Sequence, residues 1–98
     1  MTTLLAKVSA LANPNRLQIL HLLDDPRLHF APGDFDECDG VCGLYIADKL
    51  GISAPTASAH LKLLVQAGFL TPTRIGKFTY FKRVRSAMKE LAQEVADL

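Results

Sequence analysis

Two cysteines, Cys38 and Cys42, are the side chains in this sequence best suited to reactive chemistry. With this C-x3-C spacing, both thiolates could bind a soft metal or metalloid ion, or the two thiols could oxidise to a disulfide. The third interpretation is a pair of ordinary reduced thiols, as is usual in the cytosol. All three remain open. Thiol chemistry is favoured because both residues sit together at the one unusual loop of the chain.

A metal site would need further ligands, because two soft ligands make an incomplete tetrahedral set and C-x3-C is a weaker signal than C-x2-C. They could come from a second subunit's cysteine or from His29, Asp36, Glu37 or Asp39. A thiophilic metal or metalloid ion is the one cofactor that this pattern suggests.

A second group of residues has the types and spacing that suit contact with DNA. From Ser53 to Lys62 the side chains are mostly small or polar, so a helix made of them can approach the floor of the major groove and bond to base edges. Arg74 and Lys77 flank a tight turn and can reach phosphates or an adjacent minor groove. An exposed amphipathic helix without a ligand is the alternative, and His60 could instead bond to a group inside the domain. The predicted DNA contacts are Ser53, Thr56, Ser58, His60, Lys62, Arg74, Lys77 and Tyr80.

Charge is segregated along the chain, although the net charge is only +1. Residues 1–50 hold four bases and seven acids, a net charge of −3, and residues 51–98 hold seven bases and three acids, a net charge of +4. Residues 51–85 hold six bases and no acid. Because this basic stretch coincides with the predicted DNA contacts, it favours a polyanionic partner on one face. Lys82, Arg83 and Arg85 are expected to extend the positive field toward the DNA backbone.

A helix, a tight turn and a second helix must position these residues. The first helix starts at residue 41 or 42 and ends at Gly51, which suits the left-handed conformation that ends helices. Ser53 caps the second helix, Pro55 fits its first turn, and Gly68 ends it. Two strands, residues 70–75 and 78–83, then form a hairpin with a basic tip. This order is typical of a winged helix-turn-helix, which places one helix in the major groove and a β-wing beside it.

Helices are also predicted on both sides of this unit. Thr3 can cap a first helix, and Asn13 with Pro14 starts a second, which runs to about residue 23 and is apolar around most of its circumference, as expected of a buried core helix. Residues 24–40 show no periodicity, and a break of this length tends to be functional or disordered. A last helix spans about residues 86–98.

The chain is long enough for a single domain, residues 1–98, with one core. The expected fold is mainly α, with about five helices and a two-stranded wing. No apolar run approaches the ~20 residues of a membrane span, and residues 1–7 do not resemble a signal peptide, so we expect a cytoplasmic protein that does not bind membranes. No nucleophile has a base nearby in sequence and no phosphate-binding loop occurs, so an enzyme is not expected.

Three collinear motifs resemble the ArsR-type family of bacterial winged-helix repressors. Residues 11–20, LANPNRLQIL, are similar to the family's LADPTRLRIL opening. Residues 53–70, S-x-P-T-x-S-x-H-L-K-x-L-x-x-A-G-F-L, resemble its recognition helix, and residues 74–81 resemble its wing. The resemblance covers essentially the whole chain outside residues 24–40. It implies a repressor that leaves its operator DNA when an effector binds.

The resemblance also implies a homodimer whose first and last helices pack across a two-fold axis, and the apolar stripes on both helices agree with this. The expected interface residues are Leu4, Val8, Leu11, Met88, Leu91 and Val95. Such a dimer would hold two recognition helices ~34 Å apart and read an imperfect palindrome in double-stranded DNA.

Metalloid-sensing members of the family carry a C-V-C-D-L-C motif, and Cys42 matches its middle cysteine. Gly40 and Tyr45 stand at the positions of the other two, so that triad is not present as such. Residues 84–98 contain no histidine, which excludes the family's other common site, made of Asp and His ligands on the last helix. The expected effector is a metal, metalloid or oxidant sensed through Cys38 and Cys42. The alternatives are a repressor with incidental cysteines that responds to a small molecule or protein partner, and a winged-helix module that binds proteins.

Overall fold

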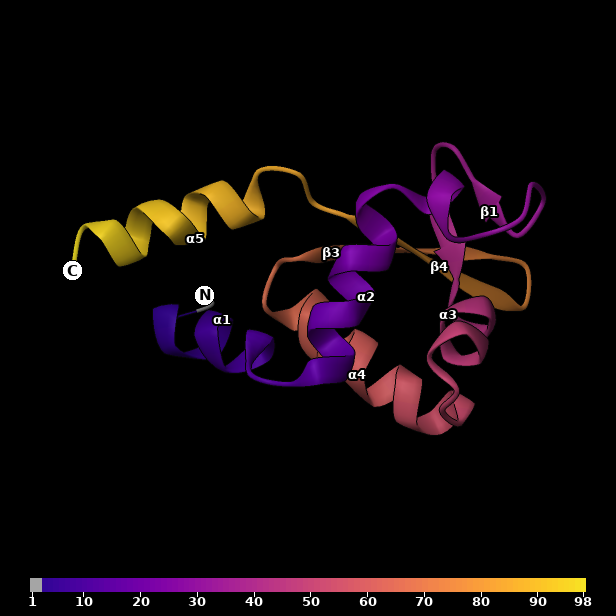
Figure 1. Ribbon diagram of the computed structural model, residues 1–98, viewed down its shortest axis with the longest axis horizontal. Coiled ribbons are helices and arrows are strands. Elements are labelled where there is room, and N and C mark those ends of the chain that lie inside the picture. Colours follow the sequence, from indigo (N-terminus) through magenta and orange to yellow (C-terminus); the bar gives the residue numbers. More distant parts are fainter. Residues whose placement is uncertain (1–2) are drawn as a thin grey trace.

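A computed structural model of the protein describes residues 3–98; residues 1–2, part of the segment expected not to be a signal peptide, lie outside the described residues. Figure 1 shows the elements, which in chain order are α1 (Leu4–Leu11), α2 (Pro14–Asp24), the 3₁₀ helix η1 (Pro26–Leu28), β1 (Phe35–Asp36), β2 (Gly40–Cys42), α3 (Gly43–Leu50), α4 (Ala54–Gln66), β3 (Leu70–Ile75), β4 (Phe78–Arg83) and α5 (Ala87–Ala96). The predicted winged fold, with five α-helices in the described chain, is confirmed.

Capping signals in the sequence correctly placed the starts of α1, α2 and α4 and the end of α3. Side-chain oxygens of Thr3, Asn13 and Ser53 accept hydrogen bonds from first-turn amides of α1, α2 and α4 respectively. Gly51 adopts a φ of +68° at the end of α3, as its position after the last helical residue predicts. These ends fix the turn between α3 and α4, and therefore the direction in which α4 leaves the body of the protein.

The wing belongs to a larger sheet than the sequence indicated. β3 and β4 pair along their full length as predicted, but the antiparallel sheet has four strands in the order β1-β2-β4-β3. Val41 and Cys42 of β2 lie opposite Phe81 and Tyr80 of β4. Residues 24–40 are therefore not one irregular loop, and α3 begins at Gly43 rather than at residue 41 or 42. Strands of two and three residues are too short to show an alternating pattern, which is why the sequence did not reveal them.

The core lies between the helices and one face of the sheet. The largest fully buried side chains are Phe69, Ile19, Ile46, Leu64 and Val41, which come from α2, β2, α3, α4 and the segment before β3. The composition of α2 suggested a helix that is buried on all sides, but the structure buries only part of it. Four of its apolar residues are buried, whereas Leu17 is 52% exposed.

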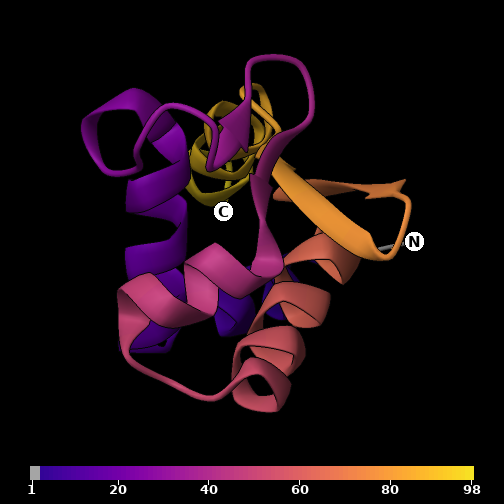
Figure 2. The same ribbon diagram turned by 90° about the vertical axis from the view of Figure 1, so that its right-hand side faces the viewer.

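The two ends of the molecule differ in composition. α1 and α5 lie side by side at one end, and Lys7 of α1 forms an ion pair of 2.9 Å with Glu94 of α5 (Figure 1). α3, the start of α4 and the tip of the wing lie at the other end, which faces the viewer in Figure 2. None of the helices in residues 3–98 is long and apolar enough to span a membrane.

Candidate DNA-binding surface

α4 presents a small and polar face to solvent. Its residues Ala57, Leu61 and Leu64 are buried, which anchors one side of the helix in the core. Thr56, Ser58 and Lys62 are exposed on its remaining surface. Three of the predicted DNA contacts are thus accessible on one helix, which is the first requirement for contact with a groove.

Ser53 has the capping role that its position predicts. Its hydroxyl oxygen accepts from the Thr56 amide at 3.3 Å, and the hydroxyl donates to Thr56 Oγ1 at 2.9 Å. If the Ser53 hydroxyl donated a hydrogen bond to a phosphate, that bond would replace the one that it donates to Thr56 Oγ1.

His60 is half-buried and bonds inside the chain, one of the two roles that the sequence left open. Its Nδ1 lies 3.1 Å from the guanidinium of Arg16 on α2, and because arginine only donates, Nδ1 is the acceptor. Arg16 Nε also donates to the carbonyl of Ala10 at 2.7 Å. Sequence reasoning gave Arg16 no role. Its place in the motif of residues 11–20 was the only signal, since its partner is 44 residues away.

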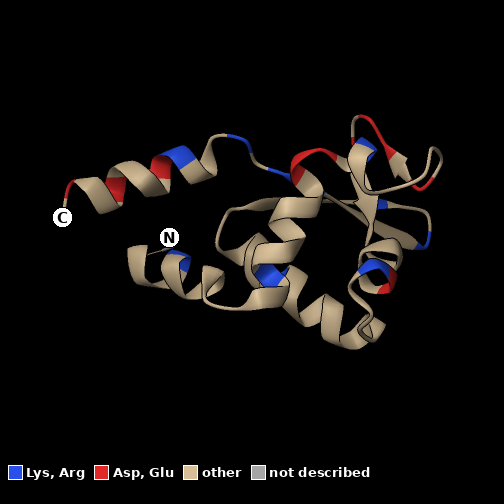
Figure 3. Ribbon diagram, in the orientation of Figure 1, with Lys and Arg blue, Asp and Glu red and all other residues tan. Residues whose placement is uncertain are grey.

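The wing tip is basic and exposed. Arg74 Nε donates to the carbonyl of Gly76 at 3.1 Å, which fastens the turn while the side chain stays exposed. Lys77 is exposed at the tip, and Tyr80 is half-buried in the middle of β4. Figure 3 shows basic residues at the wing tip, whereas acidic residues gather at the β1–β2 hairpin, the end of α2 and along α5. The wing tip is therefore basic and separated from the main acidic clusters.

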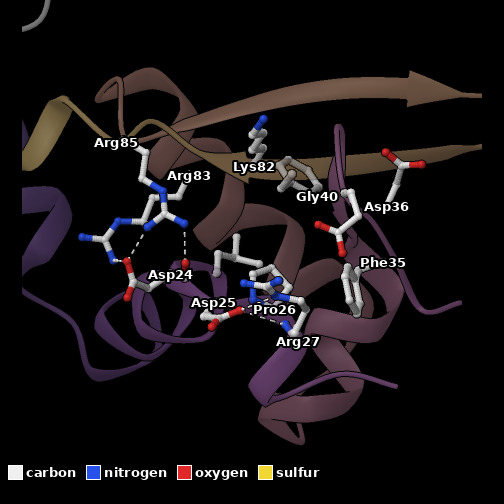
Figure 4. A pocket seen from close by; sticks show the side chains of 13 residues that line it. Asp24, Asp25, Pro26, Arg27, Phe35, Asp36, Gly40, Lys82, Arg83 and Arg85 are labelled. Atoms are coloured by element: carbon white, nitrogen blue, oxygen red, sulfur yellow. Dashed lines mark hydrogen bonds and ion pairs between the residues drawn. The ribbon is translucent and has the colours of Figure 1, made fainter. Parts of the chain in front are cut away.

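Two of the basic residues in the stretch 51–85, Arg83 and Arg85, bond to α2 and not to the candidate DNA-binding surface. Arg83 donates to the carbonyl of Leu20 at 2.9 Å, and Arg85 donates to both the carboxylate and the carbonyl of Asp24. Figure 4 shows both guanidiniums turned toward the carboxyl end of α2. The expectation that they extend the positive field toward DNA was wrong, because they satisfy carbonyls at that helix end instead. Lys82, the third of this group, is exposed.

The two cysteines lie in different surroundings. Cys38 is exposed in the turn between β1 and β2, where its amide donates to Asp36 Oδ1 at 2.7 Å, and Cys42 is only 4% exposed at the end of β2. Between them β2 is extended, rising ~3.3 Å per residue away from the turn. A disulfide requires Cα atoms within ~7 Å, so pairing the two would require β2 to leave the sheet. In residues 3–98 no group of three or more His, Cys, Asp or Glu side chains is placed to hold a metal ion.

The expected dimer residues divide into two sets. Leu91 is 5% exposed and packs within the protomer, because α5 lies against α1 of the same chain. Leu4, Leu11 and Met88 are partly buried against the same core. The more exposed apolar side chains of the two helices are Leu5, Val8, Val95 and Leu98, at 79%, 44%, 48% and 89%.

Comparison with known proteins identifies the family. No protein-family model matches the sequence. An uncharacterised helix-turn-helix-type transcriptional regulator of Bacillus subtilis, YbzH, is 46% identical over 85 residues, which cover 85% of this chain and 85% of that protein. A crystal structure of a possible transcriptional regulatory protein (fragment 1–100) from Mycobacterium bovis is 31% identical, with a TM-score of 0.68, over 97% of this chain and 92% of that chain.

A solution structure from Mycobacterium bovis, of a homodimeric winged helix-turn-helix DNA-binding domain described as a possible ArsR-family regulator, is 30% identical. Its TM-score is 0.66, and the match covers 94% of this chain and 76% of that chain. These similar proteins are transcriptional regulators, a class without enzymatic activity, which confirms that the protein is not an enzyme. The motifs, the fold and these relatives agree, and the chain belongs to the ArsR-type family of winged helix-turn-helix transcriptional regulators.

Proposed function

We propose that the protein is a homodimeric repressor that binds an imperfect palindrome in double-stranded DNA and leaves it when an effector acts. The observation that carries this proposal is the exposed polar face of α4 beside a basic wing tip, within a stretch of residues 51–85 that holds no acid. Groove-facing polar side chains would read bases, and the wing cations would contact phosphates.

Support for a dimer comes from the apolar side chains that α1 and α5 leave exposed at the end of the molecule opposite the wing. The relative from Mycobacterium bovis with the same fold is homodimeric. A two-fold axis at this end would present two copies of α4 to successive turns of one face of the duplex, ~34 Å apart.

For the effector, we propose thiol chemistry at Cys38 and Cys42. Cys42 is the N-cap residue of α3 and pairs with Tyr80 in the sheet, so a change at its sulfur would disturb both the start of the helix-turn-helix and the base of the wing. Cys38 supplies an exposed thiol close to it in sequence. Because the described residues bring no third ligand to the pair, the arrangement supports oxidation or modification more than a resident metal ion.

Operator binding measured by fluorescence anisotropy tests the proposal, with DNA from upstream of the protein's own gene. The reduced dimer should bind it, and affinity should fall steeply as salt rises. Thr56→Ala and Ser58→Ala should change the preferred base at single positions. Two outcomes would contradict the proposed DNA-binding surface and favour a protein-binding module. One is the absence of operator binding at low salt, and the other is binding that does not depend on DNA sequence and is unchanged by both substitutions.

The effector is tested in the same assay with diamide, As(III), Cd(II) and Zn(II). Release by one of them in the wild type, but not in a Cys38→Ser/Cys42→Ser variant, would establish a thiol sensor. Loss of the diamide response in Cys38→Ser alone would indicate a disulfide, and persistence of the response would indicate modification of Cys42. Binding unchanged by all four agents would leave the cysteines incidental.

A further inference from the structure

A pocket of about 340 Å³ lies between the start of α3, the first half of α4 and the wing tip. Leu44, Leu61, Phe78 and Phe81 form most of its apolar lining. Leu44 and Phe78 are 52% and 46% exposed, so their apolar surfaces are accessible to a ligand. Ligand sites of ~300–1,000 Å³ with mostly apolar walls and a few polar groups are common in proteins, and this pocket is at the small end of that range.

The floor of the pocket is closed where Gly43 of α3 packs against β4 and α4. A Cβ at Gly43 would stand 3.2 Å from the Phe81 ring and 3.6 Å from Leu61 Cδ1, so only glycine allows α3 to pack this closely against Phe81. Cys42, which is 4% exposed, also borders the pocket. A ring would therefore lie in the open part of the pocket, between the half-exposed side chains of Leu44 and Phe78.

The polar part of the lining is electropositive. Lys77 is the one charged residue in the lining, beside the hydroxyls of Ser58 and Thr79. Gly43 and Ala54 are the first residues of α3 and α4, so two helix N-termini, each with partial positive charge, meet here. Neither helix has an acid in its first turn, and α3 has no side-chain cap. An anionic group would be stabilised at this mouth.

We propose that this pocket binds a small aromatic monoanion, of the size of benzoate or naphthoate, and that the bound anion excludes operator DNA. The ring would lie against Leu44 and Phe78, and the anionic group would face Lys77 and Ser58. Exclusion follows because Ser58 and Lys77 are themselves predicted DNA contacts, on the recognition helix and the wing. This inference rests on the proposed function, and it locates one route of regulation within the DNA-binding surface.

The first test is a titration of the ¹⁵N-labelled protein with 2-naphthoate, followed by NMR. We expect amide shifts concentrated at Gly43, Leu44, Ala54 and Phe78. The neutral analogue 2-naphthylmethanol should bind about fivefold more weakly, since it lacks the charge that Lys77 and the helix termini stabilise. Shifts scattered over α1 and α5, or an equal affinity for the neutral analogue, would overturn the proposal.

A matched pair of variants makes the test specific. Leu44→Ala should weaken 2-naphthoate binding by about fivefold or more, because it removes apolar contact surface. Leu17→Ala is the control, since Leu17 is also 52% exposed but lies on α2 outside the pocket. Equal affinities of the two variants for 2-naphthoate would contradict the assignment of the site.

Competition with operator DNA completes the experiment. 2-Naphthoate should displace operator from the wild type, and from Leu44→Ala only at a correspondingly higher concentration. Simultaneous binding of both ligands would overturn the exclusion. If no operator binds at all, the proposed function fails, while the titration still decides independently whether the pocket takes an aromatic anion.

Discussion

The guanidinium of Arg16 on α2 lies 3.1 Å from Nδ1 of His60 on α4. The same arginine donates to the carbonyls of Ala10, at 2.7 Å, and of Ser9 near the end of α1. One side chain therefore ties the corner between α1 and α2 to the middle of the recognition helix. It links the end of the molecule that carries the exposed apolar residues to the surface proposed to contact DNA.

Arg16→Ala is expected to lower the free energy of unfolding by about 1–3 kcal/mol, because it leaves part-buried acceptors without a donor. His60→Ala should cost less, since Arg16 keeps its carbonyl partners. Urea denaturation measures both. Arg74→Ala is the control, because Arg74 is exposed and bonds only across the wing turn. Equal stabilities of the Arg16 and Arg74 variants would show that the Arg16 contacts contribute little.

Gly40→Ala is expected to prevent the native sheet from forming, whereas Gly33→Ala should be tolerated. Both glycines have positive φ, +92° and +96°, so each substitution carries a similar backbone strain of about 1–2 kcal/mol. A Cβ at Gly40 would also stand 2.0 Å from the carbonyl oxygen of Phe81, while nothing lies within 4 Å of one at Gly33. Thermal unfolding of the two variants isolates the clash. Similar melting temperatures would mean that β2 does not press against β4 as described.

Lys77→Ala should make operator binding less dependent on salt, by about 0.9 in the slope of log K against log salt for each phosphate that the lysine neutralises. Arg85→Ala should leave the slope unchanged, because Arg85 pairs with Asp24 at the end of α2. Anisotropy titrations at several salt concentrations compare the two. A smaller slope for Arg85→Ala than for Lys77→Ala would reverse our assignment of these cations.

Val8→Asp and Val95→Asp are expected to produce monomers, because a charge at an apolar interface costs more than a dimer of this size can tolerate. Light scattering coupled to gel filtration should then give a mass near 10.7 kDa instead of twice that value. Leu28→Asp serves as the control: Leu28 is 75% exposed on η1, away from α1 and α5. A dimer that survives both valine substitutions would place the interface elsewhere.

Prediction from the sequence succeeded where a few neighbouring residues carry the information. Ser53 and Pro55 mark the start of α4, and Gly51 marks the end of α3, because caps and positive φ depend on the residue itself and its near neighbours. The two wing strands were located to the residue, since their alternation and the Gly76-Lys77 turn lie within one short segment. The motifs that indicated the family are local in the same way.

Prediction from the sequence failed where the role of a side chain depended on partners distant in sequence. Arg83 and Arg85 looked like part of a DNA-facing field, but the carboxyl end of α2, about 60 residues earlier, takes both of them. Leu91 looked like an interface residue, but it is 5% exposed and belongs to the core cluster of its own chain.

The sequence alone determined the winged helix-turn-helix and its family, because periodicity, capping and turn chemistry are properties of short segments. Only the tertiary structure decided how those segments meet. It added β1 and β2 to the wing, separated Cys38 at the surface from Cys42 in the interior, and opened a pocket between Gly43, Phe78 and the start of α4. The physical reason is that burial, ion pairing and pocket shape arise from contacts between distant residues, and these exist only once the chain has folded.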